Sequence, residues 1–332
     1  MKNQFFFLVF LVITFSGCQP ASNLQSTNPL PSWNSGSTKQ AIQNFVNQVT
    51  STSSPNFVPP AQRIAVFDND GTLWAEQPNY FEAMFLYNQI KMQASQHPEW
   101  KIKEPFTSIL KDDVTTALAS SANAYDQMKM AIHANISTNE FEEIATAWIA
   151  SARHPRTGKL LTQMTYKPML ELLTYLRNNG FKTFIVSGGN DEFMRTWTEL
   201  AYGIPPEQVI GSNLKEQFVI SNDSAAIMLL PQTDRECWNG GKVVAIQQVI
   251  GRRPIIAFGN SDGDLEMLQW TATGKGAHLA VYIHHTDSIR EWAYDRQSAI
   301  GKLNKGLDEA KAKGWTVVNM KDDWNKIFAF EE

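Results

Sequence analysis

Residues 63–73 read Arg-Ile-Ala-Val-Phe-Asp-Asn-Asp-Gly-Thr-Leu, and this stretch decides the fold. The apolar, β-branched run from Ile64 to Phe67 is typical of a buried strand in a parallel sheet. It ends in two carboxylates, Asp68 and Asp70, which are followed by a glycine. Ligands of open α/β sheets gather at this carboxyl edge, and two buried charges need a partner, so the pattern indicates a cation site. A turn rich in Asp and Asn is the plain structural alternative.

Three further motifs follow in the chain. Residues 182–189 read Lys-Thr-Phe-Ile-Val-Ser-Gly-Gly, a second strand ending in a serine, and a helix over 168–180 precedes it. Residues 240–242, Gly-Gly-Lys, open a helix. The apolar run 254–258 predicts a third buried strand, which ends in Gly-Asn-Ser-Asp-Gly-Asp at 259–264. A serine hydroxyl and glycine amides before a helix suit phosphoryl oxygens.

These four motifs, in this order, resemble those of the haloacid dehalogenase superfamily, whose phosphatases open with Asp-x-Asp-x-Thr. The resemblance implies an α/β fold with a Rossmann-like parallel sheet and hydrolysis through an aspartyl-phosphate. Asp68 would be the nucleophile, and Asp70 would protonate the leaving oxygen and later activate water. The implied catalytic residues are Asp68, Asp70, Ser187 and Lys242, and the implied phosphate-binding residues are Thr72, Ser187, Gly188 and Lys242. A dehalogenase is disfavoured, because those members lack the second Asp.

The resemblance also implies Mg²⁺, a cation that prefers oxygen ligands. Its ligands would be the Asp68 carboxylate, the main-chain carbonyl of Asp70 and Asn260. Asn260 stands where the family usually has Asp, so weaker metal affinity is expected. Asp262 is the alternative ligand, and Asp264 would lie beside the metal site near Lys242.

Far more chain separates Thr72 from Ser187 than a crossover requires. Helical patterns cover 80–95, 103–119, 124–133 and 138–153, and Ser137 and Glu140 form a capping box. The insertion resembles the helical cap of phosphoserine phosphatase, which favours small substrates. The expected division is a cap over 76–162 and a core formed by 38–75 and 163–332.

Several cap residues are substrate candidates. In phosphoserine phosphatase a Glu nine residues after the nucleophile reads the substrate amine. Gln77 holds that position here, with Glu76 one residue earlier, so the substrate stays open. Tyr80 and Arg153 are further candidates, beside His154 and Arg156. The cap is rich in aromatic residues that either stack on a choline-like cation or, more plainly, pack its core: Trp74, Tyr80, Phe81, Tyr87, Trp100 and Trp148.

The region after the fourth motif carries fewer signals. Residues 277–284 read as a strand ending in His284 and His285, which either assist leaving-group protonation or form a hydrogen-bonded turn. Residues 302–313 predict a helix and 315–318 a strand. Residues 214–230 predict a hairpin.

The N-terminus has the pattern of a targeting signal. Lys2 is followed by an apolar run over residues 5–15, too short to span a bilayer, and then by Ser-Gly-Cys18. The pattern indicates a signal peptide of residues 1–17 and resembles a bacterial lipobox, which would make Cys18 a lipid anchor in the cell envelope. An ordinary signal peptide is the alternative. Residues 18–37, rich in Ser, Asn, Gln and Pro, read as a flexible linker, with ordered structure from about Thr38.

Composition excludes several classes. The 332 residues are 43% hydrophobic and 19% charged, so a disordered or fibrous chain is excluded. Two cysteines exclude a disulfide scaffold. A net charge of −4 gives no positive field for nucleic acid. We therefore expect an exported, Mg²⁺-dependent phosphomonoesterase acting on a small phosphorylated metabolite. A phosphotransferase or mutase of the same superfamily and a non-catalytic envelope binding lipoprotein are the alternatives.

Overall fold

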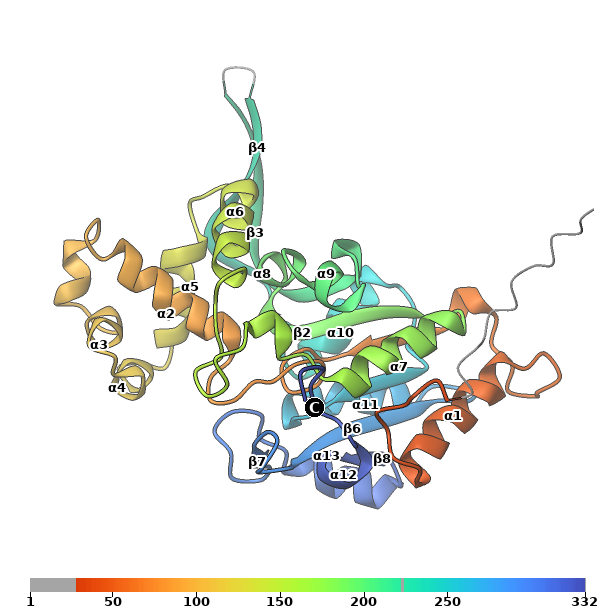
Figure 1. The fold of residues 1–332 in the computed structure, drawn as a ribbon. Coiled ribbons are helices and arrows are strands. Elements are labelled where there is room, and N and C mark those ends of the chain that lie inside the picture. The colour runs from red at the N-terminus through yellow and green to blue at the C-terminus, as the bar shows by residue number, and fades with distance from the viewer. Residues whose placement is uncertain (1–27, 222–223, 332) are drawn as a thin grey trace, which may run out of the picture.

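The computed structural model describes residues 28–221 and 224–331. An eight-stranded sheet in the order β4-β3-β2-β1-β5-β6-β7, with β8 paired to β6, forms the centre of the molecule (Figure 1). The strands are β1 Ile64–Phe67, β2 Lys182–Asn190, β3 Val209–Ser221, β4 Ser224–Arg235, β5 Ile256–Gly259, β6 Leu279–Thr286, β7 Ala293–Tyr294 and β8 Thr316–Asn319.

The core of the sheet is parallel, and its strand order reverses once. From β1 the chain adds β2 and β3 on one side, and β5, β6 and β8 lie on the other side, all in parallel. The reversal lies between β1 and β5, which is where ligands of such sheets bind. The predicted α/β fold with a Rossmann-like parallel sheet is confirmed.

Both faces of the sheet are covered by helices. Ile64 and Val66 of β1 belong to one hydrophobic cluster, whereas Ala65 and Phe67 belong to the other. This explains why the strand is apolar throughout instead of alternating. The helices of the core are α1 Ser37–Thr50, α7 Lys167–Asn178, α8 Asp191–Arg195, α9 Thr198–Tyr202, α10 Gly240–Val249, α11 Leu265–Ala272, α12 Lys305–Lys313 and α13 Met320–Asp323.

A helical insertion lies to one side of the sheet, at the left in Figure 1. Its helices are α2 Phe81–Gln93, α3 Phe106–Leu110, α4 Val114–Ala119, α5 Ala124–His133 and α6 Thr138–Ile149. Phe85 of α2 packs against Phe141 of α6 at 5.9 Å and against Phe193 of α8 at 5.3 Å between ring centroids. The insertion therefore shares its apolar core with the sheet domain.

Two helix predictions in this insertion need correction. The single helix predicted over 103–119 is interrupted between α3 and α4, where Asp112 adopts a φ of 63° and Asp113 caps α4 through the Thr116 amide. A short polar side chain that caps a new helix competes with continuing the old one. The helix predicted to reach Arg153 ends at Ile149, because the chain then forms a turn in which Arg153 pairs with Leu160.

The hairpin predicted over 214–230 is present and longer than expected. β3 and β4 pair antiparallel from Asn213 to Arg235, and the hairpin extends away from the body at the top of Figure 1. Near its middle, Leu229 of β4 exchanges backbone hydrogen bonds with the α5–α6 connection, to Asn135 N at 2.7 Å and Ile136 O at 2.9 Å. The hairpin thus ties the helical insertion to the core.

The prediction of a flexible linker up to residue 37 is wrong for its last part. Leu30 and Trp33 are buried, and the Trp33 indole N–H donates to the Pro168 carbonyl at 2.9 Å. Trp33 also packs edge-on against Trp324 at 5.6 Å. Cys18 and residues 1–17 lie outside the described residues. Among the described residues, no helix has both the length and the apolar character to cross a bilayer.

Candidate active site

The predicted site residues meet at the carboxyl edge of the two central strands. Asp68 directly follows β1, and its amide donates to the Phe258 carbonyl of β5 at 2.9 Å. Asn260 directly follows β5. Both side chains are buried, and they lie at the point where the strand order reverses.

Lys242, near the start of α10, binds two carboxylates at once. Its Nζ lies 2.7 Å from Asp68 Oδ1 and 2.5 Å from Asp264 Oδ1. The other Asp264 oxygen accepts the amides of Asn260 and Ser261, both at 3.0 Å. Burial alone would lower the pKa of Lys242, but Asp264 and Asp68 outweigh it and raise that pKa. The ammonium is therefore charged and fixed beside Asp68.

The site holds more negative groups than positive ones. Burial, together with Asp264, raises the pKa of Asp68 in spite of Lys242, and burial raises the pKa of Asp70 to about 6. Glu76 is also buried nearby, and desolvation raises its pKa well above the ordinary value. A divalent cation would balance this excess, so the residues present fit one.

The oxygen atoms that could bind a cation at this site belong to different chemical groups. Among the residues that the structure describes, no group of three His, Cys, Asp or Glu side chains is arranged to hold a metal. A cation here would therefore depend on amide and main-chain oxygens beside the Asp68 carboxylate, which are donors that Mg²⁺ accepts.

Asn260 is held from both ends of its amide. Thr72 Oγ1 donates to Asn260 Oδ1 at 3.1 Å, and Asn260 Nδ2 donates to Glu76 Oε1 at 2.7 Å. Asp262, the alternative ligand, instead accepts the amides of Asn304 and Gly306, both at 2.9 Å. Its carboxylate thus binds the amides at the start of α12.

Asp70 lies beside an aromatic pair. The Trp74 indole N–H donates to Asp70 Oδ1 at 2.8 Å, and the Trp74 ring stacks on Trp197 at 4.0 Å. The hydrogen bond favours the ionised carboxylate, whereas burial disfavours it. A carboxyl balanced in this way can exchange a proton near neutral pH.

Ser187 lies within β2, three residues before the strand ends at Asn190, and two glycines follow it, so the strand extends beyond the predicted end at Ser187. The buried Ser187 hydroxyl accepts the Gly189 amide at 3.1 Å. β2 continues to Asn190, whose side chain caps the short helix α8 through the Phe193 amide. Gly188 and Gly189 therefore lie in β2 rather than at the start of α8, and the Gly189 amide is engaged by the Ser187 hydroxyl.

The substrate candidates of the cap share contacts with the C-terminal region. Gln77 donates to the Ile300 carbonyl at 3.3 Å, and the Tyr80 hydroxyl accepts the Gly301 amide at 3.3 Å. Glu76 binds Asn260, as described above. Arg153 is exposed and donates to Gly158 within its own turn. Glu76, Gln77 and Tyr80 thus form contacts at the junction between the insertion and the core, and Arg153 does not.

His154 and Arg156 lie at the same junction between the insertion and the core. His154 is buried and contacts the Gln77 carbonyl through Nε2 at 2.8 Å. Arg156 donates to the Glu291 carbonyl at 2.8 Å and lies over the Trp292 ring. The aromatic residues of the cap are buried or half-buried in its packing.

The two histidines near the end of β6 have structural partners. His285 is buried and contacts the Gly71 carbonyl through Nε2 at 2.7 Å and Glu291 through Nδ1 at 3.2 Å. His284 contacts Asp295 at 3.3 Å. Both histidines lie in a strand instead of the predicted turn, and their hydrogen bonds within the protein favour a structural role over one in leaving-group protonation.

Three residues near the site were missed from the sequence. Trp238 is half exposed and covers Gly188 within β2, since a Cβ on Gly188 would lie 2.7 Å from its ring. Glu82 of α2 accepts the Asn190 amide at 2.8 Å, and Tyr294 donates to Glu76 at 2.7 Å. For Trp238, its position four residues before Lys242 was a signal in the sequence, whereas Glu82 and Tyr294 had none.

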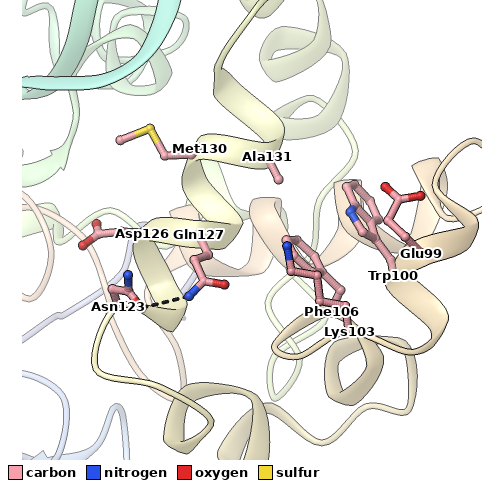
Figure 2. Close-up of a pocket in the computed structure, with 9 residues that line it drawn as sticks. All are labelled: Glu99, Trp100, Lys103, Phe106, Asn123, Asp126, Gln127, Met130 and Ala131. Atoms are coloured by element: carbon pink, nitrogen blue, oxygen red, sulfur yellow. Dashed lines mark hydrogen bonds between the residues drawn. The ribbon is translucent and has the colours of Figure 1, made fainter.

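A separate cavity of about 400 Å³ lies within the helical insertion (Figure 2). Trp100 and Phe106, stacked at 4.8 Å, contribute its apolar wall, and Asp126 lies at its opposite side. None of the four sequence motifs contributes to its lining. It is distinct from the Asp68 site.

Comparison with known proteins places this geometry in context. The model of the haloacid dehalogenase-like hydrolase family matches residues 65–269, more than half of the chain. No curated protein matches the sequence. A conserved, functionally unknown protein from Anaerococcus prevotii has a similar structure, with 17% identity, a TM-score of 0.58, and coverage of 88% of this chain and 94% of that one.

Two further solved structures are less similar. A protein of unknown function from Bordetella pertussis matches with 15% identity and a TM-score of 0.48, covering 78% of this chain and 99% of that one. A phosphoserine phosphohydrolase-like protein from Francisella tularensis matches with 15% identity and a TM-score of 0.42, covering 78% and 97%.

Proposed function

The chain belongs to the haloacid dehalogenase-like hydrolase family, and on that premise we propose that it is a Mg²⁺-dependent phosphomonoesterase acting on a small phosphorylated metabolite. The observation that carries the proposal is the buried Lys242 between Asp68 and Asp264, at the edge of the sheet where β1 pairs with β2, the strand of Ser187. An ammonium fixed beside a nucleophilic carboxylate is what attack on a phosphate dianion requires, because the two anions otherwise repel.

Asp68 is the nucleophile of the proposed reaction. Its carboxylate attacks phosphorus and forms an aspartyl-phosphate, and water then hydrolyses this ester. Lys242 and the Ser187 hydroxyl bind the phosphoryl oxygens and stabilise their charge. Because Lys242 also binds Asp264, it stays in place when Asp68 turns toward the substrate.

Asp70 is the proposed acid and base. Its carboxyl protonates the leaving oxygen in the first step and removes a proton from water in the second. The pKa of about 6, raised by burial, suits both tasks. Trp74 holds the carboxyl through its indole N–H, so the proton is delivered from a fixed position.

The cation would be held by the Asp68 carboxylate, the Asp70 main-chain carbonyl and Asn260 Oδ1. When bound, Mg²⁺ supplies positive charge that offsets repulsion between the phosphate and the carboxylates. Asp262 is engaged by Asn304 and Gly306, which supports Asn260 as the ligand. Separate Asn260→Ala and Asp262→Ala variants test this, since only the first should weaken Mg²⁺ binding.

A phosphate-release assay tests the function. The full chain is incubated with Mg²⁺ and a panel of small phosphomonoesters, and inorganic phosphate is measured with and without EDTA. Release that needs Mg²⁺ and is lost in Asp68→Asn supports the proposal. Phosphate transfer to an added alcohol would instead identify a phosphotransferase. No release from any ester, or full activity in Asp68→Asn, would overturn the proposal.

We further propose that the protein is exported and tethered to a membrane of the bacterial cell envelope through a lipid on Cys18. The support is the sequence alone, a basic start and short apolar run ending in Ser-Gly-Cys. Labelling of expressing cells with radioactive palmitate tests it, because wild type should take up label and Cys18→Ser should not. Equal labelling of both would contradict the assignment.

A further inference from the structure

The residue that replaces the family's usual Asp has an unusual partner. Asn260 Nδ2 donates to Glu76 Oε1 at 2.7 Å, and the Tyr294 hydroxyl donates to the same oxygen at 2.7 Å. Glu76 and Asn260 are each only 1% exposed. Burying a further carboxylate near Asp68 and Asp70 opposes folding unless its contacts compensate. The pairing with Asn260 therefore calls for an explanation.

The pairing fixes which end of the amide is available. An amide can bind a cation only through its oxygen, because its NH₂ group is a donor. Glu76 engages Nδ2, so Oδ1 is left on the side of Thr72, whose hydroxyl lies 3.1 Å away. Glu76 thus selects the orientation in which Asn260 can serve as a ligand, and it places a carboxylate one hydrogen bond behind the uncharged amide.

The pair is enclosed by glycines from distant parts of the chain. A Cβ on Gly71 would lie 2.0 Å from Asn260 Nδ2, and a Cβ on Gly301 would lie 1.8 Å from Glu76 Oε1. Both glycines have positive φ, 71° and 64°. Tyr294 and Gly301 lie beyond the residues that match the family model. The C-terminal region therefore completes the enclosure around this pair.

We propose that Glu76 is a positioning residue that holds the Asn260 amide with its oxygen directed to the cation site. Glu76 and Asn260 together replace the single Asp of the family. The inference rests on the proposed Mg²⁺ site. It assigns Glu76 to the metal site rather than to the substrate.

Magnesium affinity is the readout that tests the pair. Mg²⁺ binding to the full chain is measured by isothermal titration calorimetry without substrate, and the melting temperature is measured without metal to check folding. The variants are E76A, E76Q, N260D and the exchanged pair E76Q/N260D. E171Q is the matched control, since Glu171 also accepts two protein hydrogen bonds, both from Ser32.

The expected pattern separates positioning from bulk charge. E76A should weaken Mg²⁺ binding roughly 10- to 100-fold, the usual effect of losing a partner of a metal ligand. N260D should lower the melting temperature and bind Mg²⁺ no more tightly than wild type, because two carboxylates then meet at the pair. The E76Q/N260D exchange restores one donor and one acceptor and should return affinity to within about threefold of wild type.

Other results would overturn the inference. These are unchanged affinity in a folded E76A, tighter binding by N260D alone, or an exchanged pair no better than N260D. If E76A fails to fold, the Mg²⁺ affinities of N260D and E76Q/N260D still test the inference. A wild-type protein that binds Mg²⁺ yet hydrolyses no ester would refute the proposed function and leave this inference standing, whereas absence of Mg²⁺ binding would refute the inference.

Discussion

Lys242 Nζ lies 2.7 Å from Asp68 Oδ1, although 174 residues separate the two in the chain. Lys242 also binds Asp264, so one ammonium serves two buried carboxylates. This arrangement makes the lysine structural as well as catalytic, and the two roles can be separated.

We expect Lys242→Met to abolish phosphate release and to lower the free energy of unfolding by roughly 3–5 kcal/mol, because it leaves buried carboxylates unpaired. Urea unfolding and the phosphate assay measure the two effects. Adding Asp264→Asn should recover part of the stability but none of the activity. If the Lys242→Met/Asp264→Asn double variant has the same free energy of unfolding as Lys242→Met alone, the ion pair shared by Lys242 and Asp264 is contradicted.

Trp74→Phe should move the basic limb of the kcat/KM profile to higher pH. The Trp74 hydrogen bond lowers the pKa of Asp70 against the rise caused by burial, so its loss raises that pKa. The protonated acid then persists to higher pH, by roughly half to one unit. A pH series on a small monoester measures it. An unchanged basic limb in a folded variant would show that Asp70 is not the acid.

Gly188→Ala tests whether Trp238 covers the glycine pair near the end of β2. The added methyl would lie 2.7 Å from the Trp238 ring, so the ring or the strand must shift. We expect a loss of roughly 1–3 kcal/mol in the free energy of unfolding, with a reduced kcat/KM. Because Trp238 is half exposed, Trp238→Ala alone should cost less. The double variant should regain most of the loss, and additive losses would contradict the contact.

The central features of the fold could be predicted because they depend on local sequence. The run from Ile64 to Phe67 is buried on both faces, so its apolar character shows directly in the sequence. The residue that follows each strand then reaches the same edge by the geometry of a parallel sheet. Asp68 and Asn260, which directly follow β1 and β5, were found in this way, whereas Ser187 lies within β2, three residues before its end.

Other features could not be predicted because their partners are distant in sequence. Glu76 was identified as a residue of interest, but its contacts with Asn260 and Tyr294 span 184 and 218 residues. Leu30 and Trp33 lie in a stretch of polar residues and prolines, and only the pocket beside Trp324 makes them part of the core. Composition alone therefore gave the wrong start for the folded domain.

Shortening the N-terminus tests that corrected start. A chain that begins at residue 28 keeps Leu30 and Trp33, whereas one that begins at residue 38 loses both. Losing the buried Trp33 alone should cost roughly 3–5 kcal/mol, by analogy with Trp→Ala changes in cores. Thermal and urea unfolding of both chains, with Trp33→Ala in the longer one, measure this. If the two chains have equal free energies of unfolding, the original prediction of a linker up to residue 37 is correct.

His133 makes the helical insertion sensitive to acid. It is 1% exposed, packs against Phe85 and Phe141, and neither ring nitrogen has a hydrogen-bond partner among the described residues. Burial, with a smaller effect of Lys129, lowers its pKa from 6.5 to about 3. The neutral form is therefore required in the folded state, while the unfolded chain binds a proton below pH 6.5.

The sign of the effect follows from this difference. Between pH 6.5 and 3 the unfolded state binds more protons, so the His133 contribution to stability is complete above pH 6.5 and is lost as pH falls. At pH 5 the loss is about 2 kcal/mol. His133→Leu should remove it, so the stability of the variant relative to wild type should rise by about that amount between pH 7 and pH 5. Urea unfolding at both pH values measures the difference, and parallel pH dependence of the two proteins would show that His133 is not the group responsible.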